Sequence, residues 1–240
     1  MTSPAPASAE NDHRATAVLF DFGGVLTSSV FAAFEALGAS LGCDPRLPLR
    51  LLGQDSDARA LLIAHEEGRI GEGQFEQGFA ARLRHHGVDV DGSGLVRRIQ
   101  SKMRADDDMI RLVADVRAAG FRVGLLSNSL GDDCYAGFDL DEMFDAVTIS
   151  GEIRTRKPSA RAYEIACARL GSDPDATVMV DDLRQNIVAA ENVGLTGVLH
   201  REASDTARQL WGALGRTQPS DSLPQRVAKH FETKNGWTRH

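Results

Sequence analysis

Cysteine, aromatic residues and excess positive charge are all scarce in this 240-residue sequence. The three cysteines, Cys43, Cys134 and Cys167, are odd in number and far apart, which excludes a disulfide framework or a CxxC metal site and favours the reducing cytoplasm. The net charge of −7, without a long block of one sign, argues against a protein that binds nucleic acid or anionic membranes. No apolar run approaches the roughly 20 residues that span a membrane. We therefore expect a cytoplasmic protein with a small-molecule ligand, as a monomer or homodimer.

Short apolar runs alternate with helical stretches of about ten residues in most of the chain. Strands are expected over 17–21, 122–126, 146–150, 177–180 and 195–199, helices over 109–119, 160–170, 183–193 and 206–214, and a loop over 151–158. This alternation predicts an α/β fold, a Rossmann-like doubly wound parallel sheet with helices on both faces.

Residues 29–105 have a different pattern. Phe75, Phe79 and Leu83 recur at helical spacing, and glycines and prolines divide the segment into four or five short helices. We expect an inserted all-helical cap domain over the strand ends. The remaining boundaries follow from it: a core domain of 17–28 and 106–214, a disordered arm over 1–16, and a loose tail over 215–240 in which 227–231 has helical spacing.

Polar side chains follow four of the expected strands. Asp21 ends the first, Ser127 the second, Lys157 lies in the loop after the third, and Asp181 and Asp182 end the fourth. Each alone has an ordinary explanation as a turn residue, a surface charge or a helix cap. Doubly wound sheets, however, bring these strand ends to one crevice. Carboxylates that suit Mg²⁺, together with a lysine and a hydroxyl, are typical of a phosphoryl-transfer site.

Four motifs carry a resemblance to a known family. The runs Asp21-Phe22-Gly23-Gly24-Val25, Ser127-Asn128, Lys157-Pro158 and Val180-Asp181-Asp182 with Asn186 resemble, in order and spacing, the motifs of the haloacid dehalogenase-like (HAD) hydrolase superfamily. The helical insertion resembles its C1-type cap, found in subfamily I. The run Glu66-Glu67-Gly68-Arg69-Ile70 followed by Phe75 is similar to caps of bacterial sugar-1-phosphate phosphatases and of the phosphatase domain of bifunctional epoxide hydrolases.

The resemblance implies a Mg²⁺-dependent phosphatase that acts on a small phosphorylated metabolite, with Asp21 as the nucleophile. It implies that Mg²⁺ is held by Asp21, the Gly23 carbonyl and Asp182, with Asp181 second or through water. Phosphoryl oxygens would be bound by Ser127, Lys157 and the backbone N–H groups of Asn128, Phe22 and Gly23, and Asn186 would brace the fourth motif.

Position 23 departs from the family pattern. Most family phosphatases carry a second aspartate two residues after the nucleophile, on the same side of the extended chain, where it acts as general acid and base. Gly23 has no side chain. Three functions stay open: a phosphatase that lacks this group, a weakly active or inactive HAD domain that binds a phosphorylated ligand or a protein partner, and a haloacid dehalogenase.

Histidines of the expected cap are the other candidates for the missing proton transfer. His65, His85 and His86 have the right chemistry, since the pKa of histidine lies near neutral. Charged and polar residues surround all three histidines in the sequence, which instead favours solvent-exposed positions on helices.

Overall fold

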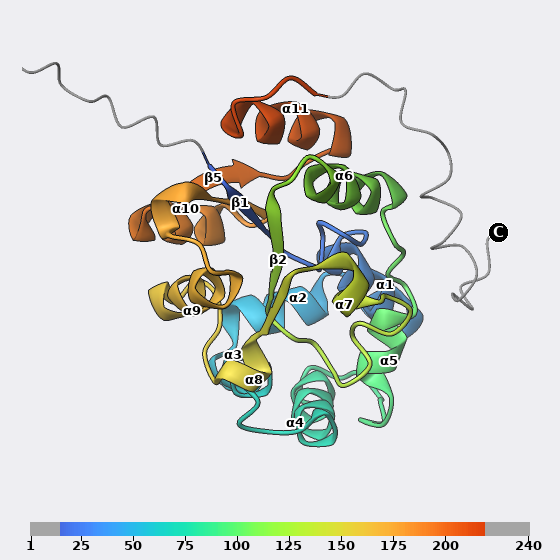
Figure 1. Ribbon diagram of the computed structural model, residues 1–240. Coiled ribbons are helices and arrows are strands. Elements are labelled where there is room, and N and C mark those ends of the chain that lie inside the picture. The colour runs from blue at the N-terminus through green and yellow to red at the C-terminus, as the bar shows by residue number, and fades with distance from the viewer. Residues whose placement is uncertain (1–14, 219–240) are drawn as a thin grey trace, which may run out of the picture.

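A single parallel sheet forms the centre of the computed structural model, which describes residues 15–218 (Figure 1). Its strands are β1 (Ala17–Phe20), β2 (Arg122–Ser127), β3 (Ala146–Ile149), β4 (Thr177–Asp181) and β5 (Thr196–Leu199). They lie in the order β3-β2-β1-β4-β5, and every pair is parallel. The predicted Rossmann-like α/β fold is confirmed.

Helices cover both faces of this sheet, as the alternation of side chains along β1 shows. Val18 and Phe20 pack in one apolar cluster with α6 (Asp107–Ala118) and α11 (Ala203–Ala213). Ala17 and Leu19 pack in another cluster with α9 (Ala160–Leu170) and α10 (Arg184–Val193). Because both faces of β1 are buried, the strand is apolar throughout rather than alternating with polar residues.

The ends of the core helices follow ordinary capping chemistry. The Asp106 carboxylate accepts from the N–H groups of Asp108 and Met109 at the start of α6, and Gly171 ends α9 in the left-handed conformation.

Three short elements are not predicted: α7 (Leu140–Met143), α8 (Ser150–Ile153) and the 3₁₀ turn η1 (Pro174–Ala176). The expectation of a loop over all of 151–158 is therefore wrong at its start.

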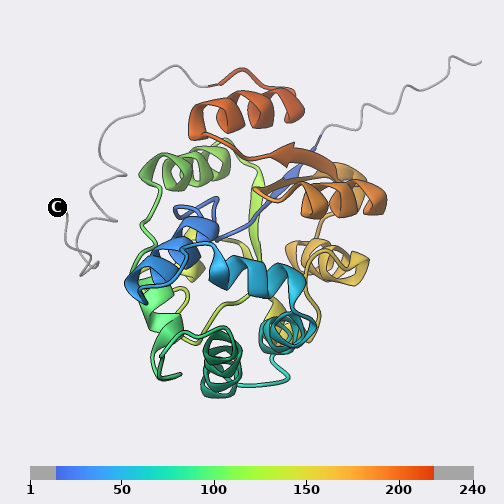
Figure 2. The same ribbon diagram turned by 180° about the vertical axis from the view of Figure 1, so that it is seen from behind.

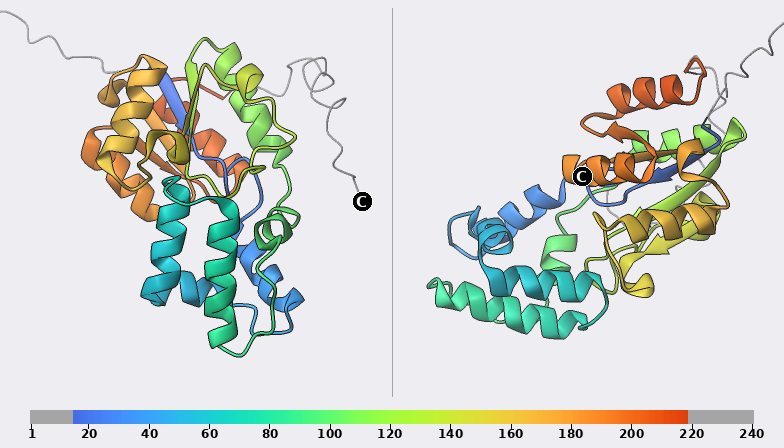
Figure 3. Two further views of the ribbon diagram at one scale, coloured as in Figure 1. Left: turned by 90° about the horizontal axis from the view of Figure 1, so that it is seen from below. Right: turned by 90° about the vertical axis from the view of Figure 1, so that its left-hand side faces the viewer.

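Between β1 and α6 the chain forms five helices with a hydrophobic cluster of their own. They are α1 (Val30–Ser40), α2 (Leu47–Gln54), α3 (Ser56–Glu66), α4 (Glu72–His85) and α5 (Leu95–Gln100). Seen from behind and from two further sides, α2, α3 and α4 lie apart from the sheet (Figures 2 and 3). The chain enters and leaves this part side by side: Asp106 N–H donates to Leu26 O at 2.9 Å and Ser28 N–H to Arg104 O at 2.8 Å. The division into core and cap stays a proposal.

Two terminal predictions meet the described residues only in part. Ala15 is buried and Thr16 N–H donates to Ala176 O, so these two residues pack on the core although the disordered arm was expected to include them. Residues 1–14 and 219–240, with the helix expected at 227–231, lie outside the described residues. Within 15–218, no helix is long and apolar enough to cross a membrane.

Candidate active site

Asp21 stands one residue beyond β1, where the sheet holds its backbone. Its N–H donates to Val180 O at 2.9 Å, which aligns the end of β1 with the end of β4. The side chain is buried, and its Oδ1 accepts the Phe22 N–H at 2.7 Å. The carboxylate is thereby turned toward the other strand ends, as the sequence predicts for a group at this edge of a parallel sheet.

Lys157 joins two of the predicted carboxylates. Its Nζ lies 2.7 Å from Asp21 Oδ1 and 2.7 Å from Asp181 Oδ2, and the side chain is 1% exposed. Burial alone would lower the pKa of this lysine, but the charges of Asp181 and Asp21 outweigh it and raise the pKa. The ammonium group is thus charged in a site closed to bulk water, where a fixed charge acts strongly on a bound anion.

Two asparagines hold these charged groups in place. The Asn128 side chain binds both sides of the Lys157 backbone: its Oδ1 accepts the Lys157 N–H at 2.9 Å and its Nδ2 donates to the Lys157 carbonyl at 3.1 Å. Asn186 Nδ2 lies 3.0 Å from each carboxylate oxygen of Asp181. The geometry is that of a brace on the fourth motif. The side-chain contact of Asn128 is not predicted, since only its backbone N–H was expected to act.

Asp21, Asp181 and Asp182 each present a carboxylate oxygen, and these oxygens lie within 4.8 Å of one another. Both oxygens of Asp181 already accept hydrogen bonds, from Lys157, Asn186 and the Leu183 N–H. The Asp182 carboxylate accepts none from any other residue that the structure describes. Among the described residues, Asp182 and the Oδ2 atom of Asp21 thus offer the carboxylate oxygens that are free to hold a cation.

Close approach of the backbone completes this cradle. Gly24 has φ +82°, and a Cβ there would lie 2.4 Å from Asp182 Oδ2. Only a glycine fits this approach, because both the conformation and the space exclude a side chain. A hard oxygen-liganded cation such as Mg²⁺ fits the donor set, with remaining positions for water and phosphate oxygens.

The pKa values of two of these acids lie well above their usual range. Burial raises the pKa of Asp21 to about 8 against the opposing pull of Lys157, and Asp181 and Asp182 raise it further. Burial, with the neighbouring Asp181, raises the pKa of Asp182 to about 6. A divalent cation would stabilise both ionised forms, so its binding would release protons near neutral pH.

The groups expected to bind the phosphoryl oxygens differ in whether they already make hydrogen bonds within the protein. Within residues 15–218, the N–H groups of Gly23 and Asn128 donate to no protein acceptor and are open to a ligand. The Phe22 N–H already binds Asp21 Oδ1 and is not open in this arrangement. Ser127 is buried beside them, and its hydroxyl makes a long contact to Asn128 O at 3.5 Å.

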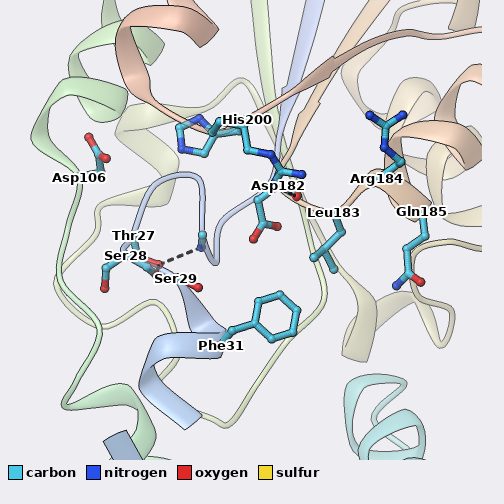
Figure 4. A pocket seen from close by; sticks show the side chains of 12 residues that line it. Thr27, Ser28, Ser29, Phe31, Asp106, Asp182, Leu183, Arg184, Gln185 and His200 are labelled. Atoms are coloured by element: carbon cyan, nitrogen blue, oxygen red, sulfur yellow. Dashed lines mark hydrogen bonds between the residues drawn. The ribbon is translucent and has the colours of Figure 1, made fainter. Parts of the chain in front are cut away.

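A cavity of about 680 Å³ opens beside Asp182, between the start of α1 and the loops after β4 and β5. Its lining includes Phe31 from α1 and, from the core, Arg184, His200 and Arg201. In Figure 4 the Asp182 carboxylate points into this space, with the Phe31 ring facing it from the other wall. The volume suits a small metabolite.

The histidines of α3 and α4 divide into two groups. His85 and His86 are exposed, as expected. His65 is buried, so its predicted exposure is wrong. Its Nε2 accepts the Gly131 N–H at 3.0 Å, its Nδ1 lies 3.4 Å from Ile70 O, and its ring stacks on Phe75. An imidazole used in this way connects α3 to the loop after β2 and has no free nitrogen with which to carry protons in the reaction.

With this geometry in view, a model of the haloacid dehalogenase-like hydrolases matches residues 15–194. The chain belongs to this family. The motifs around Asp21, Ser127, Lys157 and Asp182 all lie within the matched part, which confirms the resemblance read from the sequence and makes the protein a HAD-family hydrolase.

Similar proteins extend this picture. A glyceraldehyde 3-phosphate phosphatase of Methanothermobacter thermautotrophicus is 30% identical over 89 residues, which cover 35% of this chain and 39% of the relative. A phosphoglycolate phosphatase of Caulobacter vibrioides is 26% identical over 203 residues, 79% of this chain and 80% of the relative. The solved structure of a HAD family enzyme of Bacteroides thetaiotaomicron, in complex with magnesium and inorganic phosphate, has a TM-score of 0.58 at 21% identity and covers 78% of this chain and 94% of that one. This last likeness concerns the fold.

Proposed function

We propose that this HAD hydrolase is a Mg²⁺-dependent phosphatase that hydrolyses a small phosphorylated metabolite through an aspartyl-phosphate on Asp21. The observation that carries the proposal is the single contact group of Asp21, Lys157 and Asp181, with Asp182 beside it. It joins a nucleophile, a fixed positive charge and a cation site. The phosphatase relatives support the same chemistry.

Each residue has a defined part in this reaction. An oxygen of the Asp21 carboxylate attacks phosphorus, and the bond from phosphorus to the leaving oxygen breaks, with the electron pair going to the leaving group. Lys157 and the free N–H groups of Gly23 and Asn128 bind the phosphoryl oxygens as their charge rearranges, and Ser127 adds a hydroxyl. Water then attacks the aspartyl-phosphate, which releases inorganic phosphate and restores the carboxylate.

The cation would be held by Asp21, Asp182 and the Gly23 carbonyl, with Asp181 acting second or through water. Bound there, Mg²⁺ supplies positive charge that orients the phosphoryl oxygens and offsets their repulsion from the carboxylates. The cavity beside Asp182 gives the leaving group a place to lie, between Phe31 and the arginines of the core loops.

Phosphate release from a generic aryl phosphate, with and without Mg²⁺, tests the proposal, and a panel of phosphorylated metabolites then narrows the substrate. We expect release that requires Mg²⁺ and is absent in Asp21→Asn. Intact binding of a phosphorylated ligand without turnover would instead favour a non-catalytic HAD domain. Metal-independent turnover of 2-chloropropionate would favour a dehalogenase, although Asp182 beside Asp21 would have no role in that reaction.

A further inference from the structure

The end of α3 lies against two parts of the core, the loop after β2 and the short helix α8. Ser150 Oγ donates to Glu66 O at 2.5 Å, and the Ser129 hydroxyl lies 3.4 Å from the same carbonyl oxygen. Gly68 lies so near α8 that a Cβ on it would be 2.5 Å from Gly151 O. Together with the bond from Gly131 to His65, these contacts place the end of α3 against the loop after β2 and against α8, which follows β3.

At this junction Glu66 projects a carboxylate into the protein interior. It forms an ion pair with Arg156, through Oε2 and Nε, in which the two side chains are 11% and 22% exposed. Neither of these two atoms makes a hydrogen bond with any other residue that the structure describes. Burial raises the pKa of Glu66 to about 7, against the attraction of Arg156 and Lys157. Through its pair with Arg156, Glu66 contacts the segment that carries the candidate catalytic lysine.

Arg156 immediately precedes Lys157, so a force on one moves the other. The Lys157 backbone is held by the Asn128 side chain, and its ammonium lies between Asp21 and Asp181. Both of those supports come from the core. The ion pair with Glu66 is a third support, and Glu66 belongs to the inserted helices.

We infer that Glu66 is a positioning residue which, through Arg156, aligns the Lys157 ammonium with the nucleophile, so that the site is complete only while the end of α3 is seated on the core. This inference rests on the proposed phosphatase function and adds a residue to it. Removing the Glu66 charge leaves the partly buried Arg156 guanidinium without an ion-pair partner among the described residues, next to a second cation. Arg156 then turns toward solvent or toward the carboxylates of the site, and either movement displaces Lys157.

The test compares Glu66→Gln, Arg156→Gln and the double variant with wild type. Glutamine keeps the size of Glu66 and removes only its charge. A displacement of about 1 Å in a catalytic group can lower the rate about 10²-fold, so we expect each single variant to lose up to this factor in kcat. We expect KM to change much less, and the double variant to regain part of the loss because no unpaired charge remains.

Arg82→Gln is the matched control. Arg82 forms a partly buried ion pair with Asp55, and both residues belong to the helical insertion. We expect it to lower the melting temperature about as much as Glu66→Gln but to leave kcat unchanged. If Glu66→Gln lowers only the melting temperature, as the control does, the residue is structural and the inference is wrong.

A second measurement separates this inference from the proposed function. Orthovanadate with Mg²⁺ imitates the five-coordinate phosphorus of the reaction, and its affinity reports the alignment of Lys157 without turnover. We expect the dissociation constant for orthovanadate to rise in the single variants by the factor lost in kcat, and that for Mg²⁺ alone to stay constant. Should wild type bind orthovanadate but release no phosphate, the proposed function fails while the vanadate affinities still decide the role of Glu66. No binding by wild type would overturn both.

Discussion

Replacing Gly23 with aspartate would supply the acid that most family phosphatases have, but the structure predicts that this change alone fails. A Cβ at Gly23 would lie 2.7 Å from Val30 Cγ2. Carbon atoms in contact prefer about 3.5–4.0 Å, so the two groups would overlap by roughly 1 Å. Val30 is β-branched and stands at the start of α1, which restricts its rotation. Its side chain thus occupies the space where the new one would begin.

The size of the effect follows from this overlap. Overpacking of this kind costs about 1–3 kcal/mol. In a domain of this length, each kcal/mol lowers the melting temperature by about 2–4 °C. Val30→Ala removes the colliding methyl group from a half-buried position, and alanine suits a helix slightly better than valine. We therefore expect Gly23→Asp to be destabilised and the Gly23→Asp/Val30→Ala double variant to recover most of the loss.

Catalysis should separate the two variants further. A positioned acid contributes about 10²–10⁴-fold, and it matters most for alkyl phosphates, whose leaving oxygen needs a proton. In steady-state assays we expect a gain in kcat on an alkyl phosphate for the double variant, no gain for Gly23→Asp or Val30→Ala alone, and little change on an aryl phosphate. A stable Gly23→Asp variant with increased alkyl phosphatase activity would refute the steric argument. Equal wild-type rates across leaving groups of rising pKa would refute the idea that an acid is missing.

Four further predictions concern the carboxylates and the glycine that lies against Asp182. Asp21→Asn should abolish phosphate release, and activity near wild type would remove Asp21 as nucleophile. In the metal-free protein the pKa of Asp21 is raised to about 8, so the folded chain holds a proton that the unfolded chain loses above about pH 4. Asp21 therefore contributes less to the free energy of unfolding as pH rises toward 8. Calorimetry should show Asp21→Asn gaining stability relative to wild type from pH 5 to pH 8, and a constant difference would contradict this. Titration calorimetry should show Mg²⁺ binding more tightly as pH rises through about 6, where Asp182 ionises, and further up to about 8, where Asp21 ionises. An affinity that does not change near pH 6 would exclude Asp182 as a ligand. Gly24→Ala places a methyl group 2.4 Å from Asp182 Oδ2 at a positive φ, so Mg²⁺ should bind at least about tenfold more weakly, and unchanged affinity would show that the backbone can move aside.

The sheet and the ends of its strands could be predicted from the sequence because each depends on local pattern. A buried parallel strand needs a short continuous apolar run, and the stretches before Asp21, Ser127 and Asp181 have one. Once parallel strands alternate with helices, the connection rules bring those ends to a common edge. The ion pairs from Lys157 to Asp21 and Asp181 follow from topology, although these residues are far apart in sequence.

Contacts between side chains of different elements could not be predicted in this way. His65 lies among charged residues, which is typical of an exposed helix position, yet α3 turns it toward the loop that carries Gly131. The side chain of Asn128 serves Lys157 rather than a ligand because the loop after β3 returns beside it. The four residues of α8, one of them glycine, are too few to show a helical period.

Gly23 connects these two kinds of information. The sequence has glycine at the position where most family phosphatases have the acid, and in the structure Val30 Cγ2 would lie 2.7 Å from a Cβ at that position. Lys157 and the N–H groups of Gly23 and Asn128 remain available to bind the charged phosphoryl oxygens. His65 accepts the Gly131 N–H and so does not supply the missing acid. On the proposed function, we therefore expect the leaving group to depart as its own anion. Such a site favours phosphorylated metabolites whose leaving oxygen is already a weak base, and this condition, rather than the shape of the cavity alone, limits the substrates that it can hydrolyse quickly.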